Sequence, residues 1–257
     1  MSDNSLKGKS VVIGAGAKNL GGLIARELAK EGVSGIAVHY HSDATREAAE
    51  QTVADVKTAG ADAFAIQGDL TKPAEVAKLF DAAVEKFGGV DIAINTVGLV
   101  LKKPIVDVTE EEFDTSFDIN AKSAFFFIQE SGKKLNDGGK LCTIVTSLLG
   151  AFTGYYAAYA GSKAPVEHFT RAASKEFGAR GISVTAVAPG PMDTPFFYGQ
   201  ESPEAVAYHS SAADLSKYTK TGLTHIEDIV PLVKFLVSDG WWITGQTILA
   251  NGGYTTK

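Results

Sequence analysis

Two side chains that could exchange a proton stand four residues apart in the run Tyr159-Ala-Gly-Ser-Lys163. A helix places residues i and i+4 on one face, so the phenol and the ammonium would lie side by side. A cation beside a tyrosine favours the phenolate and lowers a pKa that starts near ~10. Such a tyrosine can exchange a proton near neutral pH, as the interconversion of a carbonyl and an alcohol requires. The spacing alone is weak evidence and gains weight only from its surroundings.

A glycine-rich stretch runs from Gly14 to Gly22, where the first strand-like run ends and the first helical stretch begins. Glycines allow a tight turn and a close backbone approach, and the helix N-terminus offers free N–H groups to a pyrophosphate. Ligands of α/β proteins bind at the carboxyl ends of such strands. The stretch therefore predicts a nucleotide site rather than an ordinary turn.

The second strand-like run ends in His39-Tyr40-His41-Ser42, with no acid at the strand end itself. A carboxylate there would pair with the ribose hydroxyls of NAD and repel the 2′-phosphate of NADP. The two imidazoles, Ser42 and Arg46 could instead hydrogen-bond or neutralise a phosphate. The sequence therefore favours NADP(H) over NAD(H) as the cofactor.

These residues need elements to position them, and the chain alternates short apolar runs with longer amphipathic stretches. The strand-like runs are residues 10–13, 35–40, 63–67, 91–96, 141–146, 183–188 and 247–250. The helical stretches are residues 21–31, 44–59, 73–87, 110–135, 156–179 and 225–237. Several runs are apolar with little alternation, as expected of parallel strands covered on both faces. We therefore predict an α/β fold: one doubly wound Rossmann domain over residues 1–257, with a seven-stranded parallel sheet and helices on both faces.

The longest stretch without clear periodicity covers residues 190–222 and contains the aromatic run Phe196-Phe197-Tyr198. Long irregular segments in compact domains often serve as lids or binding loops. We interpret this one as a substrate-binding lid. Several aromatic residues could line a pocket or belong to the core, and these are Phe152, Tyr155, Tyr156, Phe196, Phe197 and Tyr198.

Composition argues against several other classes of protein. The net charge of −6 and the pI near 5.4 leave no basic stripe, so we expect neither a nucleic-acid nor an anionic membrane partner. The chain starts without an apolar signal segment, and no apolar run approaches the ~20 residues of a membrane span. We therefore expect a soluble, cytoplasmic protein. Cys142 is the only cysteine, and the five histidines have no metal-ligand spacing beyond His39 and His41, so we expect neither a disulfide nor a metal site.

Together these residues resemble the short-chain dehydrogenase/reductase family, and within it the carbonyl reductases that are similar to 3-oxoacyl-ACP reductases. The likeness runs from about Leu6 to Tyr254. The matching motifs are the glycine-rich turn 14–21, Asp69, Asn95-Thr-Val-Gly98, Asn120, Ser147, Tyr159-x3-Lys163, Pro189-Gly190-x3-Thr194 and the C-terminal run Ile243-Thr-Gly245-Gln246-Thr247 with Gly252-Gly253.

The resemblance implies an NAD(P)(H)-dependent oxidoreductase in which four residues reduce a ketone to a secondary alcohol by hydride transfer. Tyr159 would protonate the developing alkoxide, and Ser147 would donate a hydrogen bond to the carbonyl oxygen. Lys163 would stabilise the phenolate and bind the nicotinamide ribose, while Asn120 would hold a water of the proton relay. The implied cofactor-binding residues are Gly14, Lys18, Asn19, Leu20, Tyr40, His41, Ser42, Asp69, Leu70, Asn95, Gly98, Tyr159, Lys163, Pro189, Gly190 and Thr194. The implied substrate-binding residues are Ser147, Tyr155 and Phe196.

Many members of this family are tetramers built on two long central helices and the C-terminal strand. Residues 125–128, Phe-Phe-Phe-Ile, are apolar around most of a helix turn. Such a run fits burial in a core or in a subunit interface. We therefore expect a homotetramer that acts on a small-molecule carbonyl or alcohol.

The sequence departs from the family pattern at three points. The glycine-rich turn is one residue longer than usual, with Asn19 near its middle glycine, and Asn tolerates positive φ better than most residues. Thr96 and Val97 replace Asn and Ala, so the usual side-chain hydrogen bond of the second Asn cannot be assumed. The segment between Ser147 and Tyr159 is one residue shorter than a common spacing in the family. The shorter segment shifts the loop before Tyr159 but need not move Tyr159 and Lys163 on their helix.

Two other functions stay open at the level of sequence. Tyr156 lies seven residues before Lys163, which is the Tyr-x6-Lys spacing of enoyl-thioester reductases in the same superfamily. A catalytically silent nucleotide-binding scaffold would keep the fold and lose turnover. The strand-end Ser147 and the Tyr159/Lys163 pair favour carbonyl chemistry over both.

Overall fold

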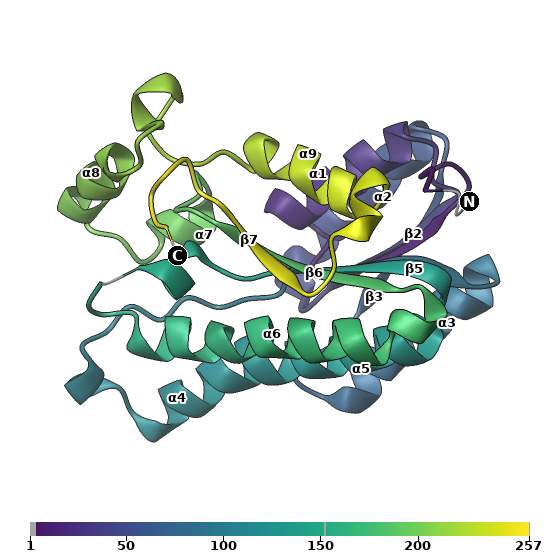
Figure 1. The fold of residues 1–257 in the computed structure, drawn as a ribbon, viewed down its shortest axis with the longest axis horizontal. Helices are drawn as coiled ribbons and strands as arrows, with labels where there is room; N and C mark the ends of the chain where they lie inside the picture. The colour runs from purple at the N-terminus through teal and green to yellow at the C-terminus, as the bar shows by residue number, and fades with distance from the viewer. Residues whose placement is uncertain (1–3, 152, 257) are drawn as a thin grey trace.

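The computed structural model describes residues 4–151 and 153–256. At its centre lies a sheet of parallel strands in the order β3-β2-β1-β4-β5-β6-β7 (Figure 1). The strands are β1 (Ser10–Gly14), β2 (Gly35–Tyr40), β3 (Asp62–Gln67), β4 (Val90–Asn95), β5 (Leu135–Ile144), β6 (Ser183–Pro189) and β7 (Gln246–Ala250). Each predicted run is found as a strand. Only β5 begins well before its predicted start at residue 141, since several of its first residues are polar and exposed and gave no apolar signal.

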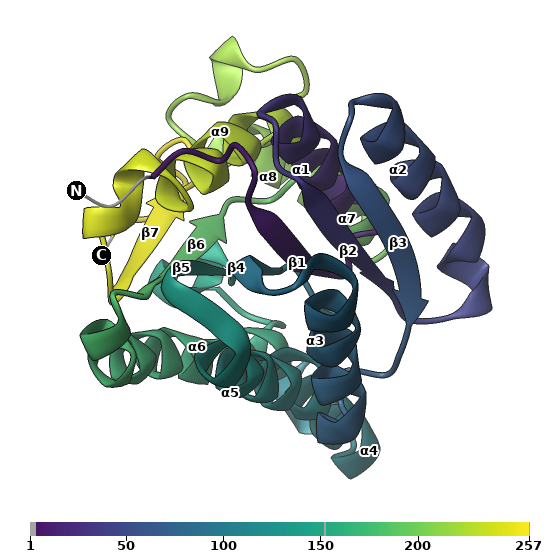
Figure 2. The same ribbon diagram turned by 90° about the vertical axis from the view of Figure 1, so that its right-hand side faces the viewer.

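Helices cover both faces of this sheet (Figures 1 and 2). One face carries α1 (Asn19–Lys30), α2 (Arg46–Thr58) and α9 (Ile226–Leu236). The other face carries α3 (Pro73–Phe87), α5 (Ser123–Lys134) and α6 (Ala157–Glu176), with α4 (Glu110–Phe117) packed against α6. The predicted doubly wound α/β fold is therefore confirmed. Within the described ranges, no helix combines the length and the apolarity that a membrane crossing needs.

Apolar side chains close both faces of the sheet. On the first face, Ile24 of α1 and Val233 of α9 are fully buried. On the second face, the rings of Phe80 and Phe127 meet edge-on with their centroids 5.0 Å apart. Full burial of a side chain of this size contributes about 1.5–3 kcal/mol. Every residue of β1, β2 and β6 is buried, which explains why these strands read as continuous apolar runs.

The strand order reverses beside β1. This strand pairs with β2 on one side and with β4 on the other. The connections that follow β1 and β4 therefore run toward opposite edges of the sheet, and a crevice opens between them at the carboxyl ends of these strands. Gly14 at the end of β1 stands opposite Asn95 at the end of β4. A Cβ added to Gly14 would lie 3.0 Å from Oδ1 of Asn95, so the two strand ends approach closely. The fold thus builds a crevice where the glycine-rich turn leaves the sheet.

The helix predicted over residues 110–135 is interrupted. A turn of π-helix over Asp118–Lys122 separates α4 from α5, and Asn120 lies within it. Helical periodicity could not reveal this interruption, because both flanking segments are helical and the π turn only widens one turn between them. Such turns recur at functional sites.

The predicted lid over residues 190–222 is more regular than its sequence suggested. It contains α7 (Pro195–Tyr198) and α8 (Pro203–Ala212), each with a proline in its first turn. Ser202 caps α8 by accepting a hydrogen bond from the backbone N of Ala205 at 3.3 Å. His209 is the only residue of α8 that is buried, so this helix has no apolar stripe from which it could have been predicted.

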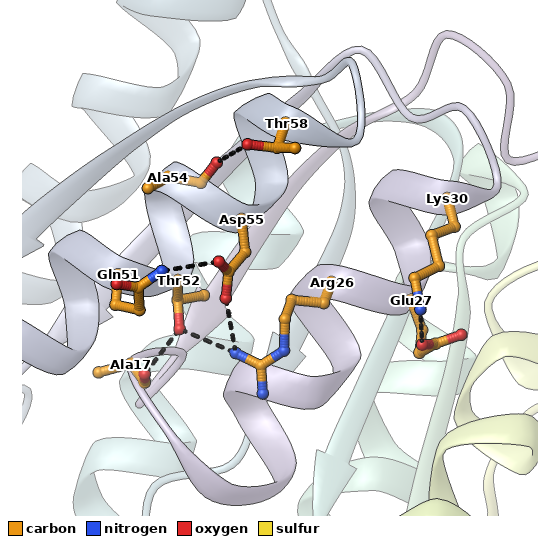
Figure 3. A network of polar contacts seen from close by, with 9 residues as sticks. All are labelled: Ala17, Arg26, Glu27, Lys30, Gln51, Thr52, Ala54, Asp55 and Thr58. Carbon is orange, nitrogen blue, oxygen red and sulfur yellow. Dashed lines mark hydrogen bonds and ion pairs between the residues drawn. The ribbon is translucent and has the colours of Figure 1, made fainter.

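A polar network ties the glycine-rich turn to α2 (Figure 3). The Thr52 hydroxyl donates to the carbonyl oxygen of Ala17 at 2.8 Å and accepts from the Arg26 guanidinium at 3.2 Å. Arg26 also forms an ion pair with Asp55 at 3.7 Å. Thr52 is buried, so its hydroxyl needs these partners. The network holds the turn that precedes α1 in a fixed position.

We expect Thr52→Val to lower the free energy of unfolding by about 1–3 kcal/mol, because the substitution leaves the Ala17 carbonyl without its partner. Thr58→Val is a matched control on the same helix, since Thr58 is exposed and bonds only to Ala54 within the helix (Figure 3). Urea unfolding of both variants measures the difference. Equal stability of the two would contradict the role given to Thr52.

Candidate active site

Lys163 extends from α6 into the interior below the crevice. Its Nζ donates to the carbonyl oxygen of Val97 at 2.8 Å and to that of Ile144 at 3.2 Å. Burial lowers the pKa of Lys163 to about 8. A Cβ on Gly98 would stand 3.1 Å from this Nζ, so the glycine leaves room for the ammonium. The lysine is thus fixed by the loop after β4 and by the end of β5.

Tyr159 lies one helical turn before Lys163 and is buried. Burial raises the pKa of its phenol to about 12, and a hydrogen bond with the Thr146 side chain lowers it in part. The sequence predicted the opposite direction, with Lys163 lowering the pKa of Tyr159. That prediction is wrong for this structure, because the ammonium donates to main-chain carbonyls while desolvation dominates at the phenol.

Asn120 is buried in the π turn, and protein groups hold its side-chain amide. Its Oδ1 accepts from the backbone N of Leu99 at 2.9 Å. Its Nδ2 donates to the Leu99 carbonyl at 2.8 Å and to the Ser162 hydroxyl at 3.0 Å. Asn120 therefore joins the loop after β4 to α6 next to Lys163. Its predicted role in holding a water stays a prediction.

A cavity beside Tyr159 encloses about 590 Å³, open solvent at its mouth included. Ser147 and Phe196, both predicted to bind substrate, line it together with Tyr159. Tyr155, the third predicted substrate residue, is 60% exposed and lies outside the lining. Phe152, which could have lined a pocket, lies outside the described residues. The cavity is otherwise largely apolar, and its further lining includes Val100, Leu148, Met192 and Phe197.

Two neighbouring hollows follow the crevice from the glycine-rich turn to the end of β3, and both touch Ala15 and Gly98. Most predicted cofactor residues line one or both; these are Lys18, Asn19, Leu20, His41, Asp69, Leu70, Gly98, Tyr159, Lys163 and Thr194. Pro189 and Gly190 line the substrate cavity instead. The remaining four, Gly14, Tyr40, Ser42 and Asn95, lie in neither hollow. We refer to the two hollows together as the cofactor groove.

The start of α1 suits a pyrophosphate. A Cβ on Gly21 would lie 2.4 Å from the Ala15 carbonyl oxygen, so only glycine permits this close packing of helix and turn. The helix has no side-chain cap and no acid in its first turn, which leaves its N–H groups and positive dipole end for an anion. Asn19 has a φ of 49°, as its tolerance of positive φ predicted, and Ala15 has a φ of 56°.

Thr96, which stands where the family pattern has its second Asn, supplies a side-chain hydrogen bond of its own. Its hydroxyl donates to the carbonyl oxygen of Gly14 at 2.9 Å, and its backbone N donates to the same oxygen at 3.1 Å. The preceding Asn95 turns its Oδ1 back to accept from the backbone N of Val97 at 3.1 Å. The ends of β1 and β4 are therefore joined by a threonine hydroxyl.

His39 lines the groove, but both of its ring nitrogens have protein partners, so the prediction that it could bind a phosphate is wrong. Its Nδ1 accepts from the backbone N of Ala15 at 3.0 Å, and its Nε2 lies 2.9 Å from the Gly68 carbonyl oxygen. Burial lowers its pKa to about 4, so the ring is neutral and bridges two backbone segments. Arg46 is paired with Asp43 at 2.6 Å. His41 remains exposed in the groove.

The lining of the substrate cavity also contains a polar cluster that the sequence did not predict. Glu201, from the lid, accepts a hydrogen bond from the Tyr156 hydroxyl and forms an ion pair with Lys102. His209 and Tyr254 complete the cluster, with Tyr254 Oη 2.9 Å from His209 Nδ1. No local signal marked these residues, because they come together only in the fold. Among the described residues, this cluster included, no group of three His, Cys, Asp or Glu side chains could hold a metal ion.

Comparison with known proteins gives a consistent picture. The family model described as enoyl-(acyl carrier protein) reductase matches residues 14–255. The short chain dehydrogenase/reductase nsrJ of Aspergillus novofumigatus is 36% identical over 264 aligned positions, which cover 96% of each chain. The chain belongs to the short-chain dehydrogenase/reductase family. It is therefore an oxidoreductase of that family.

Two further relatives of this short-chain dehydrogenase/reductase bear on its ligands. The hydroxynaphthalene reductase-like protein Arp2 of Metarhizium brunneum is 35% identical, over 98% of this chain and 97% of its own. A solved structure from Burkholderia cenocepacia, described as that of a dehydrogenase with bound NADP, is 65% identical. It covers 100% of this chain and 97% of its own, with a TM-score of 0.99.

We expect Gly21→Ala to raise the Kd for NADPH at least about tenfold while the protein stays folded, because the added Cβ forces the turn away from α1. Gly178→Ala is the control, since a Cβ there meets nothing within 4 Å. Energy transfer from protein fluorescence to bound NADPH measures both affinities. An unchanged Kd for Gly21→Ala would show that the turn does not contact the cofactor.

Proposed function

We propose that this protein is an NADP(H)-preferring carbonyl reductase that converts a ketone into a secondary alcohol, reversibly. The observation that supports it most is that Tyr159 borders both the substrate cavity and the cofactor groove. A phenol at that junction can meet a substrate from one side and a cofactor from the other. Ser147 borders the same cavity, and Lys163 borders the same groove.

In this proposal Tyr159 and Lys163 would help to hold a nicotinamide cofactor, which would supply the hydride for the carbonyl carbon. Tyr159 transfers its phenolic proton to the carbonyl oxygen as that oxygen gains negative charge. The pKa of Tyr159, raised to about 12 by burial, keeps the proton on the phenol at neutral pH until it is needed. Ser147 donates a hydrogen bond to the same oxygen, where a fixed donor stabilises the developing charge.

Lys163 and Asn120 return the proton to Tyr159 after the step. The Lys163 ammonium, whose pKa burial lowers to about 8, can release a proton near neutral pH and so return one to the phenolate. It would also bind the nicotinamide ribose. Asn120, fixed beside it through Leu99 and Ser162, would hold the water that brings a proton in from solvent.

A preference for NADP(H) follows from the end of β2. No carboxylate stands at that strand end, and the nearby Asp43 is paired with Arg46. His41 lines the groove and is exposed, so its imidazole can donate to a 2′-phosphate. The B. cenocepacia relative with bound NADP agrees with this preference.

We expect NADPH to bind at least about tenfold more tightly than NADH in separate fluorescence titrations. His41→Glu should weaken NADPH binding by about tenfold or more and leave NADH binding much less affected, because a carboxylate at this place repels a 2′-phosphate. Tighter binding of NADH by the unaltered protein would overturn the preference.

Enoyl-thioester reduction is the second candidate, because the matching family model carries that description and Tyr156 lines the cavity. Tyr156 would then be the proton donor in place of Tyr159. Its hydroxyl already donates to Glu201, and burial together with this carboxylate raises its pKa. The phenol of Tyr156 is therefore engaged in a structural contact, which favours carbonyl reduction.

We expect Tyr159→Phe to lower kcat for ketone reduction by about 10²–10⁴-fold, the usual range for loss of a general acid. Tyr156→Phe should lower it less than about tenfold. NADPH consumption with a ketone panel and with an enoyl thioester measures both. The reverse ranking, with turnover of the enoyl thioester, would assign the protein to enoyl reduction. A scaffold would bind NADPH and consume none with any substrate.

We also propose a cytoplasmic homotetramer. Phe127 and Ile128 of the apolar run are buried in the chain's own core, whereas Phe125 is 43% exposed. The Phe125 ring packs edge-on against Phe169 of α6, 5.2 Å away, so α5 and α6 share an apolar outer face. A second copy could cover that face.

Light scattering should give a mass four times the 27.0 kDa of the chain. Phe125→Glu should shift the mass toward smaller species, because it places a charge in the apolar contact. A monomer mass for the unaltered protein would disprove the tetramer.

A further inference from the structure

The polar cluster opposite the candidate catalytic residues is unusually well buried for a set of charged groups. The side chain of Glu201 is 2% exposed, and that of His209 is 7% exposed. Burying a carboxylate is costly unless charged or hydrogen-bonding partners compensate. Lys102 compensates the charge by an ion pair, and Tyr156 donates a hydrogen bond. The cluster as a whole is therefore close to neutral.

His209 and Glu201 both line the cavity, and one nitrogen of His209 has no hydrogen-bond partner in the part of the chain that is described. His209 Nε2 lies 3.9 Å from Glu201 Oε2, too far for a direct hydrogen bond. The other ring nitrogen, Nδ1, is 2.9 Å from the Tyr254 hydroxyl. Burial lowers the pKa of His209, so the ring is neutral and carries one hydrogen.

The position of that hydrogen follows from the neighbours of the ring. Burial raises the pKa of Tyr254 to about 12, so its phenol keeps a proton that it can donate to Nδ1. A hydrogen on Nε2 then points toward the Glu201 carboxylate, where a lone pair would be repelled. We assign the Nε2–H form on this ground. The cavity wall thus presents a donor and a carboxylate acceptor 3.9 Å apart.

A hydroxyl group matches this pair. Its oxygen can accept from His209 Nε2 while its hydrogen is donated to Glu201 Oε2, and a single oxygen can reach both atoms across 3.9 Å. A carboxylate or phosphate has no proton to donate to Glu201 and would be repelled by it. An ammonium cannot accept from the imidazole. A neutral hydroxyl satisfies both groups.

The same cavity holds both this hydroxyl site and the residues proposed to act on the carbonyl. Ser147 and Tyr159 line the cavity together with Glu201 and His209. Tyr156, which bonds to Glu201, is the N-cap of α6 and precedes Tyr159 by three residues. A ketone in this cavity can therefore place its carbonyl by Tyr159 and a second group by the cluster.

We propose that Glu201 and His209 bind a hydroxyl group of the substrate, so that the protein prefers ketones that carry a hydroxyl group away from the carbonyl. This inference rests on the proposed carbonyl reduction. It assigns the lid a role in substrate choice, because both residues belong to the segment predicted as a lid. Tyr254 fixes the imidazole, and Lys102 balances the charge of the carboxylate.

The test compares three ketones that differ only in the distal group: cyclohexanone, 4-hydroxycyclohexanone and 4-methoxycyclohexanone, each with saturating NADPH. The methoxy group can accept a hydrogen bond but cannot donate to Glu201. We expect kcat/KM for the hydroxy ketone to exceed that for the methoxy ketone by about 10- to 100-fold, the range for a hydrogen bond to a charged group. Acetophenone with its 4-hydroxy and 4-methoxy derivatives repeats the comparison on an aromatic ring.

Two variants then locate the hydroxyl site. Glu201→Gln should bring the hydroxy-to-methoxy ratio close to one, and so should His209→Phe, which keeps a ring against Phe197 and loses the Nε2–H. Glu204→Gln is the matched control, since Glu204 is exposed in the first turn of α8 and lies outside the cavity lining. It should leave the ratio unchanged.

Three results would overturn the inference. One is a ratio near one in the unaltered protein. Another is a Glu201→Gln variant that loses activity equally on all ketones and keeps the ratio, which would mean that the cluster only anchors the lid. The third is the absence of NADPH consumption with every ketone, and this alone would also overturn the carbonyl reduction on which the inference rests.

Discussion

The buried ammonium of Lys163 is the constraint on which the rest of the site depends. A charge removed from water costs several kcal/mol unless it finds partners, and here the partners are the carbonyl oxygens of Val97 and Ile144. Those carbonyls belong to the loop just after β4 and to the last residue of β5, so α6 must sit in one register against the sheet. The same requirement explains Gly98, whose missing side chain leaves space for Nζ. The cofactor groove and the substrate cavity therefore meet at one fixed point.

The sequence was sufficient for features that depend on local pattern. Strands buried on both faces lack alternation, and the seven apolar runs therefore predicted the parallel sheet. The four-residue spacing of Tyr159 and Lys163 implied one helix, which is α6. Asparagine tolerates a positive φ better than most residues, and Asn19 has a positive φ in the structure. Ser147, Tyr159, Lys163 and most predicted cofactor residues line the groove and the cavity, whereas Asn120 lies outside both linings. The roles of all four catalytic candidates remain predictions.

Features that depend on burial or on distant contacts could not be predicted in this way. The pKa of Tyr159 rises because the fold removes the phenol from water. The spacing of charges along the chain does not show how deeply a side chain is buried. His39 was predicted as a possible phosphate ligand, but its ring bonds to the backbone of Ala15 and Gly68, which are distant from it in the sequence. The short helices of the lid have no apolar stripe, and Glu201 meets Tyr156 only through the fold.

The lid also bears on which chemistry the site performs. Tyr156 and Tyr159 both line the cavity and both precede the same lysine, so spacing alone does not choose between them. Their partners differ: a carboxylate from the lid holds the hydrogen of Tyr156, whereas Tyr159 has only the Thr146 hydroxyl. To donate its proton to a substrate, Tyr156 must first break a hydrogen bond to a charged group, at a cost of about 1.5–3 kcal/mol. Tyr159 is free of that cost. In the carbonyl reduction we propose, the choice of proton donor is therefore made by Glu201, a residue outside the tyrosine–lysine motif.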